Sequence, residues 1–546
     1  MLRSVNRSDR GHGSPHYRPG VLLPDRSARA LVAAALTLAL VAAACSADTS
    51  DDAAPREGSA SSATSGPTTT EAPPPAGTPA ELVEHADDWP TAGQDLLNTR
   101  AAADSNITAA NVDQLEETWR AELDGAGALS TTPLVLGDTA YLQGGFGTIF
   151  AIDRATGGQR WASEARGLNI GPFGVAVGDG QVYGMDAATG VVAVGVDDGA
   201  EVWATDITAT DTTGVDIQPV IADGTVLAAS VPISISGIYA PGDRGVVSAL
   251  DAATGEVRWT FDTVKGDLWG HPEVNSGGGV WYSPTVDLER RLVFAGVANP
   301  APFPGTTEFP NGTSRLGRNL YTNSIVALDL DTGELQWFHQ VTPHDIFDRD
   351  QTHTLMARLD DGTDVIVTAG KSGVVVGLDP DDGTVRWETE VGHHDNDDLE
   401  ALDGPTVVAP GTYGGVLTPP STADGVVYLA TVDAPTELRP DETAYFGAPL
   451  GTADGEVTAV SADTGEVLWA TEVPGDPLGA TTVVNDLVFT ALLDGTLLAL
   501  DRESGEIVWT GDAGGGVNGW MAVAGDELLV PVGNADPPAL LNLALG

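Results

Sequence analysis

A repeated unit that ends in tryptophan constrains the fold of this chain more than any other feature of the sequence. In each strong copy an aspartate (a serine in one) stands eight residues before the tryptophan, and a glycine stands four residues before it. Alternating apolar residues predict a strand on each side of an Asp-x-x-Thr-Gly turn. The copies are AIDRATGGQRW ending at Trp161, ALDAATGEVRW at Trp259, ALDLDTGELQW at Trp337, GLDPDDGTVRW at Trp387, AVSADTGEVLW at Trp469, ALDRESGEIVW at Trp509 and a weaker VGVDDGAEVW at Trp203.

The repeat predicts a ring of small antiparallel sheets. Another apolar strand precedes each copy, so each unit has about four short strands, as a β-propeller blade does. The tryptophan is large enough to hold one blade against the next. Seven blades carry the motif, and an eighth can form from Met521–Gly533, Ala539–Leu545 and an early strand near Trp119. We therefore predict an all-β fold, an eight-bladed β-propeller closed by both ends of the domain.

Composition excludes one class of function. The chain has 78 acidic and 25 basic residues and a formal net charge of -53. A surface of this sign repels nucleic acids and anionic lipid headgroups, so nucleic-acid binding is not expected. The only cysteine is Cys45, which excludes a disulfide within the chain and a covalently attached c-type haem.

The N-terminal segment predicts export. Several arginines precede an apolar run, Ala30–Ala44, which is followed by Cys45. This order is typical of a signal peptide, and small residues before the cysteine resemble a bacterial lipobox. The interpretation is a lipoprotein signal over 1–45, diacylation of Cys45, a disordered Ser/Thr/Pro/Ala-rich linker over 46–86 and a propeller over 87–546. We expect a protein anchored by lipid to the outer face of the cell membrane; an ordinary secretory signal is the alternative.

Three segments resemble the quinoprotein alcohol dehydrogenases, whose propellers bind pyrroloquinoline quinone. The segments are WPTAGQDLLNTRAAADSNITAANVDQLEETW (Trp89–Trp119), GGGVWYSPTVDLERRLVFAGVANPAPF (Gly277–Phe303) and NLYTNSIVALDLDTGELQWFHQVTPHDIFDRD (Asn319–Asp350). With the repeat, the resemblance covers roughly Trp89 to Gly546. It implies oxidation of a small-molecule alcohol with hydride transfer to the quinone.

The resemblance also implies roles for four residues. Trp281 matches the aromatic side chain that stacks on the quinone, and Lys371 matches the cation beside the quinone oxygens. Asn299 and Asp348 match ligands of a calcium ion, and Asp348 also matches the catalytic base. These residue types suit the chemistry, because a planar tricarboxylate needs an aromatic face and positive charge, and calcium takes hard oxygen ligands.

Other positions depart from the family pattern. A vicinal cysteine pair is absent, Ser130 replaces a glutamate of the first blade, and Pro172 or Phe173 stands where an arginine is usual. The calcium-binding glutamate has no counterpart in Pro232–Gly245, where Asp243 is the candidate replacement.

Two hypotheses follow from these matches and departures. The first is a dehydrogenase that passes electrons to a separate acceptor. The second is a non-catalytic propeller lipoprotein that binds an envelope protein partner. In a separate motif, HHDNDD (His393–Asp398), the side chains form either a metal site or a solvated loop.

Overall fold

The computed structural model describes residues 74–546 apart from 103, 170, 187–189, 209, 211–212, 216, 233–238 and 445–449. The expected signal peptide, Cys45 and most of the expected linker lie outside the described residues. The end of that linker is folded: α2 (Ala80–Glu84) buries Leu82 and contacts β6. The folded domain therefore begins before the predicted boundary at residue 87, because Leu82 adds apolar burial.

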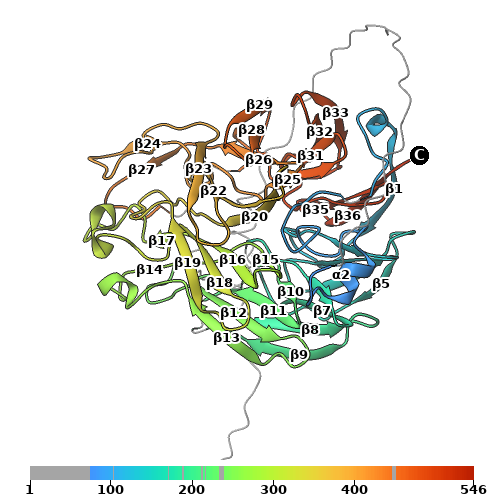
Figure 1. Ribbon diagram of the computed structural model, residues 1–546, viewed down its shortest axis with the longest axis horizontal. Coiled ribbons are helices and arrows are strands. Elements are labelled where there is room, and N and C mark those ends of the chain that lie inside the picture. Colours follow the sequence, from blue (N-terminus) through green and yellow to red (C-terminus); the bar gives the residue numbers. More distant parts are fainter. Residues whose placement is uncertain are drawn as a thin grey trace, which may run out of the picture. The chain divides into compact units, whose positions relative to one another are not determined.

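Eight four-stranded antiparallel sheets are arranged as blades around a ring (Figure 1), which confirms the predicted eight-bladed propeller. Blades 1 to 4 consist of β2 (Leu134–Leu136), β3 (Thr139–Gln143), β4 (Ile149–Asp153) and β5 (Gln159–Ala162); β6 (Ala176–Gly178), β7 (Gln181–Asp186), β8 (Gly190–Gly195) and β9 (Glu201–Asp206); β10 (Val220–Ala222), β11 (Thr225–Ala229), β12 (Val246–Asp251) and β13 (Val257–Asp262); β15 (Thr285–Asp287), β16 (Leu292–Val297), β18 (Ser324–Asp329) and β19 (Leu335–Gln340). Blades 5 to 8 consist of β20 (His353–Arg358), β21 (Asp364–Ala369), β22 (Val374–Leu378) and β23 (Val385–Glu390); β25 (Ser421–Ala423), β26 (Val426–Asp433), β28 (Asp454–Ser461) and β29 (Val467–Val473); β30 (Thr482–Val484), β31 (Leu487–Ala491), β32 (Thr496–Asp501) and β33 (Ile507–Asp512); β34 (Ala522–Ala524), β35 (Glu527–Val532), β36 (Ala539–Leu545) and β1 (Leu115–Glu122).

The eighth blade joins both ends of the domain, as predicted. Strand β1 pairs antiparallel with β36, from Leu115 opposite Leu545 to Glu122 opposite Ala539. Trp119 on β1 also donates its indole N–H to the carbonyl of Arg154 in blade 1, at 2.7 Å. This closure pairs strands that are far apart in sequence and covers the edge of β36 that would otherwise be unpaired.

The repeated tryptophan and glycine act together at seven of the eight blade junctions. Trp259, for example, donates its indole N–H to the carbonyl of Leu330 in the next blade, at 2.9 Å. Gly333, in the turn of that next blade, has a φ of +70°, and a Cβ there would lie 2.5 Å from the Trp259 ring. Glycine is thus required both for the left-handed turn and for the close approach of the indole.

A buried arginine ties the N-terminal segment to three blades near the ring centre. Arg100 is 1% exposed, and its guanidinium lies 5.5 Å from the ring of buried Trp89. Its five N–H groups all have partners, namely the carbonyls of Ala92, Thr481 and Met521 and the hydroxyls of Thr132 and Thr482. The entry segment is therefore an integral part of the core.

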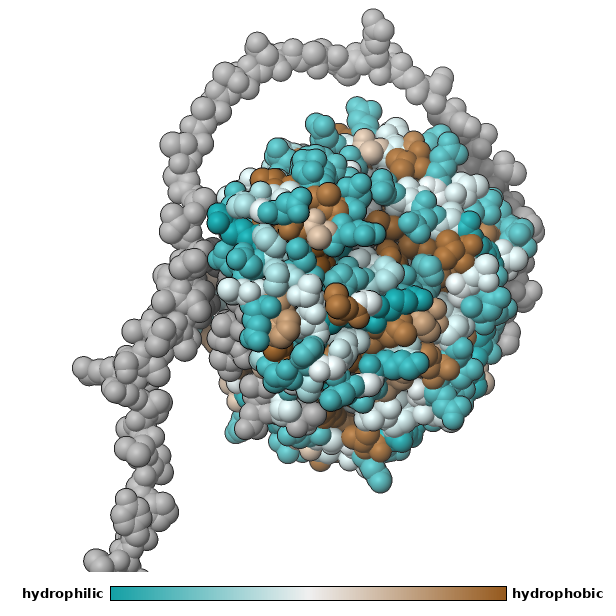
Figure 2. Space-filling view, turned by 90° about the vertical axis from the view of Figure 1, so that its left-hand side faces the viewer, coloured by the Kyte–Doolittle hydropathy of each residue, from teal (hydrophilic) through white to brown (hydrophobic). Residues whose placement is uncertain are grey.

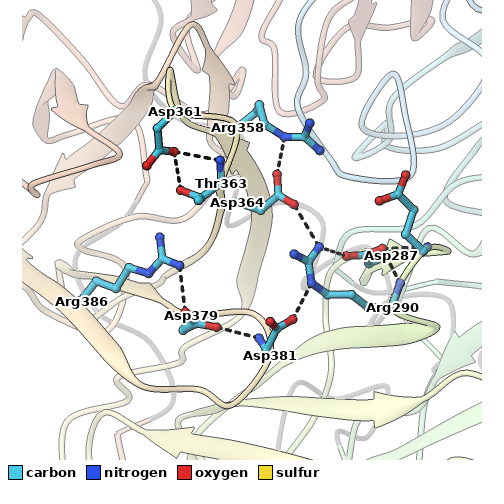
Figure 3. A network of polar contacts seen from close by, with 10 residues as sticks. Asp287, Arg290, Arg358, Asp361, Thr363, Asp364, Asp379, Asp381 and Arg386 are labelled. Atoms are coloured by element: carbon cyan, nitrogen blue, oxygen red, sulfur yellow. Dashed lines mark hydrogen bonds and ion pairs between the residues drawn. The ribbon is translucent and has the colours of Figure 1, made fainter. Parts of the chain in front are cut away.

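Charged residues connect blades 4 and 5 near their outer turns (Figure 3). Arg290 lies 2.7 Å from Asp287, 3.0 Å from Asp364 and 2.7 Å from Asp381. Asp287 and Asp364 are nearly buried, and Asp364 also pairs with Arg358. The acidic composition is thus used partly in ion pairs between blades.

Segments outside the eight blades form two additional two-stranded antiparallel sheets. Strand β14 (Ser276–Gly277) pairs with β17 (Pro300–Ala301), and β24 (Thr406–Val408) pairs with β27 (Thr436–Leu438). Short 3-10 turns η1 (Val112–Gln114), η2 (Leu268–Gly270) and η3 (Pro310–Arg315) complete the described elements. Hydrophilic and hydrophobic side chains are interspersed on the face shown in Figure 2. Within residues 74–546 as described, no helix is long and apolar enough to cross a membrane.

Candidate active site

Three of the four predicted site residues line one cavity. Its volume is about 370 Å³, within the range of roughly 300–1,000 Å³ found for ligand pockets. Trp281, Asp348 and Lys371 line it, and Asn299 contacts two other lining residues, Tyr239 and Asp350. Segments connected to all eight blades contribute to its wall, so the cavity lies where the blades converge: Ser130, Pro172, Tyr239, Trp281, Asp348, Lys371, Thr412, Leu478 and Asn518.

Asp348 lies in the connection between β19 and β20, which Asp345 shapes. The Asp345 carboxylate accepts hydrogen bonds from the backbone N–H groups of Phe347 at 2.7 Å and Arg349 at 2.8 Å. Asp348, between these two residues, has a φ of +69° and is buried. The capped loop thereby holds a carboxylate in the left-handed backbone region at the cavity wall.

Lys371 comes from the turn between β21 and β22, which is bonded directly to the Asp348 loop. The backbone N–H of Lys371 donates to the carbonyl of Asp350 at 2.9 Å. Gly370 makes this approach possible, because a Cβ there would lie 1.7 Å from that carbonyl oxygen. The Lys371 Nζ then lies 2.8 Å from Asp348 Oδ2 and 2.7 Å from Asp350 Oδ2.

Asn299 is completely buried beside these carboxylates. Its backbone N–H donates to Asp350 Oδ1 at 2.8 Å, and its side-chain Nδ2 donates to the carbonyl of Pro300 at 3.2 Å. Its Oδ1 accepts a hydrogen bond from the Tyr239 hydroxyl at 3.0 Å. An amide oxygen, a phenol and two carboxylates are therefore brought together.

Three residues of the cavity wall carry polar atoms without partners. Asp348 Oδ1, Trp281 Nε1 and Thr418 Oγ1 are buried and form no hydrogen bond within the protein. Buried polar groups are normally hydrogen-bonded, so unsatisfied ones in a cavity wall mark positions where a ligand can bind. The set contains an indole donor, a hydroxyl and a carboxylate acceptor.

Burial governs the electrostatics of the site. Burial raises the pKa of Asp348 to about 8; the Lys371 ammonium opposes this shift, and the charge of Asp350 adds to it. Burial lowers the pKa of Lys371, yet the carboxylates of Asp348 and Asp350 together raise it well above its ordinary value. The lysine is thus a permanent cation beside a carboxyl group that can exchange a proton near neutral pH.

The positions that depart from the family pattern also face the cavity. Ser130 and Pro172 line it and supply neither an acid nor a cation. Asp243, the candidate replacement for the calcium-binding glutamate, does not line the cavity, and its Oδ1 accepts a hydrogen bond from the Thr210 hydroxyl at 2.7 Å. The replacement of the glutamate by Asp243 stays a prediction, and the hydrogen bond of this carboxylate to Thr210 connects it to the segment that follows blade 2.

The HHDNDD motif forms local ion pairs. His394 Nδ1 lies 2.7 Å from Asp397, and His393 Nδ1 lies 3.1 Å from Asp433. Asp397 also accepts a hydrogen bond at its backbone oxygen from buried Arg349, at 2.9 Å. Among the described residues no three His, Cys, Asp or Glu side chains gather as a metal cluster. The hydrogen bond from Arg349 connects the motif to the loop that carries Asp348.

The oxygen donors of the site fit a hard divalent cation in type. Asp348, Asp350 and the Asn299 amide oxygen are carboxylate and carbonyl ligands of the kind calcium takes. Asp348 Oδ1 is buried and has no hydrogen-bond partner within the protein.

The cavity wall also suits a flat anionic ring system. Trp281, Tyr282 and Trp520 supply aromatic surface, and Lys371 is the cation among the described lining residues. Hydroxyl and amide groups stand in place of a second cation: Ser130, Thr352, Thr412, Thr418 and Asn518.

Two residues of the site were missed by sequence reasoning. Asp350 follows Asp348 by two positions inside a segment already singled out, so its spacing was an available signal. Tyr239 lies between two strands of blade 3, where no pattern of residues distinguishes it from an ordinary loop tyrosine. Only the fold brings its hydroxyl to Asn299.

Comparison with known protein families gives two matches. Residues 173–390 match the family described as "Glucose/ethanol/alcohol dehydrogenase, beta-propeller domain", and all four predicted site residues fall in this range. Residues 88–233 and 450–536 match the family described as "Outer membrane protein assembly factor BamB". Together the two matches cover residues 88–390 and 450–536, and they overlap over 173–233.

Individual relatives of the chain include two quinohemoprotein alcohol dehydrogenases. The chain is 29% identical over 418 residues to a quinohemoprotein alcohol dehydrogenase of Comamonas testosteroni, covering 66% of this chain and 56% of the relative. It is 27% identical over 446 residues to quinohemoprotein alcohol dehydrogenase ADH IIB of Pseudomonas putida, covering 70% of this chain and 62% of the relative. The matches thus span about three fifths of these relatives' length.

Solved structures share the fold. The crystal structure of the Comamonas testosteroni quinohemoprotein alcohol dehydrogenase superimposes with a TM-score of 0.74 and 24% identity, over 85% of this chain and 81% of that chain. The protein is therefore an eight-bladed β-propeller that is similar in sequence and in fold to the quinohemoprotein alcohol dehydrogenases.

Proposed function

We propose that the protein oxidises an alcohol in the central cavity, with pyrroloquinoline quinone and a calcium ion, and that Asp348 is the catalytic base. One observation carries the proposal: Asp348, a buried carboxylate with an unpartnered oxygen (Oδ1), belongs to the wall of a cavity that is also lined by an aromatic side chain and a lysine. The homology to quinohemoprotein alcohol dehydrogenases supports the same class of reaction.

The chain's own groups supply the proton transfer. Asp348 Oδ2 is held by the Lys371 ammonium at 2.8 Å, which leaves Oδ1 to accept a hydrogen bond from the substrate hydroxyl. Burial raises the pKa of Asp348 to about 8, so that the carboxylate is a stronger base than an exposed aspartate. Removal of the hydroxyl proton by such a base accelerates a reaction by about 10²–10⁴-fold.

Other residues of the cavity would hold the two bound groups. Trp281 and Lys371 would bind the quinone by its face and by charge, while Asn299, Asp348 and Asp350 would bind calcium. When bound, the quinone supplies the two-electron acceptor, and calcium supplies a Lewis acid. Apolar walls from Phe303, Leu450 and other side chains would restrict water at the reacting atoms.

The remaining elements of the proposal concern location and electron flow. The sequence contains no Cys-x-x-Cys-His motif, so we propose that electrons pass to a separate carrier. We also propose export and a lipid anchor at Cys45, on the basis of the apolar run and the cysteine that follows it.

A second candidate function is a non-catalytic lipoprotein that binds an envelope protein. The match of residues 88–233 and 450–536 to the BamB family favours it. Those ranges leave out Trp281, Asn299, Asp348 and Lys371, whereas the dehydrogenase family match includes all four. We therefore place oxidation first.

The test uses the full chain with added quinone and calcium. We expect saturable quinone binding by fluorescence quenching and alcohol-dependent reduction of an artificial dye. Asp348→Asn should lower the dye-reduction rate by at least about 100-fold with quinone binding retained, since it removes the base. Glu388→Gln, on β23 in the outer part of blade 5, is the matched control and should leave the rate unchanged. An Asp348→Asn variant as active as wild type would refute the assigned base, and absence of quinone binding would favour the second candidate.

A further inference from the structure

Tyr239 contacts the site from a segment to which no role has been assigned. It lies in the connection between β11 and β12, and its hydroxyl lies 3.0 Å from Asn299 Oδ1. Its ring packs edge-to-face against Phe303, with centroids 6.0 Å apart and an interplanar angle of 77°. Both rings line the cavity, so the hydroxyl has a defined position at its wall.

The partner of that hydroxyl has a fixed orientation. Asn299 is completely buried; its backbone N–H binds Asp350, and its Nδ2 binds the carbonyl of Pro300. Its Oδ1 must therefore point toward Tyr239. A carbonyl oxygen has two lone pairs, so the hydrogen bond from Tyr239 leaves one lone pair of Asn299 Oδ1 for another partner.

Nearby carboxylates make the electrostatic potential around the Tyr239 hydroxyl negative. Burial, and then the charges of Asp350 and Asp348, raise the pKa of the Tyr239 phenol well above its ordinary value. The phenol is thus neutral, and its oxygen lies in a region that attracts cations. Asp348, which is 5% exposed and lines the same cavity, has one carboxylate oxygen without a partner within the protein.

We infer that Tyr239 is a further residue of the cation site, where its hydroxyl oxygen provides a neutral ligand beside Asn299 Oδ1 for a hard divalent cation such as calcium. The two oxygens are 3.0 Å apart, which is shorter than twice a calcium–oxygen distance of about 2.4 Å, so one ion can contact both. This inference rests on the proposed function.

The neutral ligand has a measurable consequence. When both carboxyl groups are ionised, Asp348 and Asp350 contribute two negative charges and Lys371 one positive charge, so the side chains leave a net charge of about −1 for the ion. Because calcium affinity rises with the number of charged ligands, a carboxylate at position 239 should bind the ion more tightly than the phenol. A phenyl ring there should bind it more weakly.

The experiment measures calcium binding by the full chain without quinone. Wild type, Tyr239→Phe and Tyr239→Glu are compared by isothermal titration calorimetry and by the calcium-dependent shift of the unfolding midpoint, at physiological ionic strength. Tyr141→Phe, in β3 and outside the cavity, is the matched control. We expect Tyr239→Phe to lose about 10-fold or more in calcium affinity, Tyr239→Glu to gain, and Tyr141→Phe to match wild type.

Each outcome decides the inference. Equal or tighter binding by Tyr239→Phe in a protein that binds calcium would overturn the role of Tyr239 and leave the proposed function standing. If wild type does not bind at up to about 10 mM calcium, above the range of weak extracellular sites, binding by Tyr239→Glu would still support the position. Absence of binding in both would overturn this inference together with the calcium part of the proposed function.

Discussion

Replacement of Arg100 by methionine tests whether the entry segment is part of the propeller core. The guanidinium donates five hydrogen bonds, three of them to backbone carbonyls that belong to the entry segment, blade 7 and blade 8. Methionine fills similar space but donates nothing, so these carbonyls lose their charged donor. The change should therefore weaken three junctions at once.

The structure allows the size of this effect to be estimated. A buried polar group without a partner costs about 1–3 kcal/mol, which suggests about 3–9 kcal/mol for three carbonyls. Part of this cost is offset, because burial of the charge is itself unfavourable and lowers the pKa of Arg100 to about 9. Thr482 also donates to the carbonyl of Met521 at 3.4 Å. We expect a net loss of about 3–5 kcal/mol in the free energy of unfolding.

Urea denaturation measures this loss in the free energy of unfolding. Tryptophan fluorescence is a suitable signal because the Trp89 ring lies beneath the Arg100 guanidinium. Arg100→Lys keeps a charge and up to three donors and should lose less than the methionine variant. Arg120→Met removes a surface ion pair with Glu117 and should cost under about 1 kcal/mol. A loss below about 1 kcal/mol for Arg100→Met would refute the idea that these hydrogen bonds hold the junctions together.

Two further predictions concern charge. Burial lowers the pKa of His353 from 6.5 to about 3. Between these two pH values the imidazole binds a proton in the unfolded chain but not in the folded protein. The free energy of unfolding therefore falls as the pH decreases through this window, by up to about 1.4 kcal/mol per pH unit. His353→Gln should remove this part of the acid slope in denaturation series at several pH values; an unchanged slope would contradict it. Arg290→Gln should cost about 2 kcal/mol in urea denaturation because it leaves Asp287 and Asp364 nearly buried without that partner. Arg291 pairs with two exposed aspartates, so Arg291→Gln should cost under about 1 kcal/mol in the free energy of unfolding. Equal losses for the two arginine variants would contradict the idea that burial of the aspartates makes the Arg290 pairs more important.

The blade architecture was predictable because its signals are local. A turn aspartate, a glycine and a tryptophan recur at fixed spacing, and each has a short-range physical role that the structure bears out, as at Gly333 and Trp259. The closure of blade 8 by the strand around Trp119 was also predictable, since an unpaired edge would otherwise remain.

The site was predictable only in part. Trp281, Asn299, Asp348 and Lys371 were selected by resemblance, and the structure brings them to one cavity or its wall. Asp243 was chosen for its charge and its place in the chain, and in the structure its carboxylate accepts a hydrogen bond from Thr210. A side chain's direction depends on the conformation of its loop, and residue type alone does not specify that conformation.

The sequence by itself determined the repeating strand pattern, the number of blades and the acidic character of the chain, because periodicity, turn chemistry and composition act between near neighbours or over the whole chain. Only the tertiary structure decided which side chains share the central cavity. Tyr239 and Asn299 are sixty positions apart, and their contact exists because ring closure turns the loops of separate blades toward one axis.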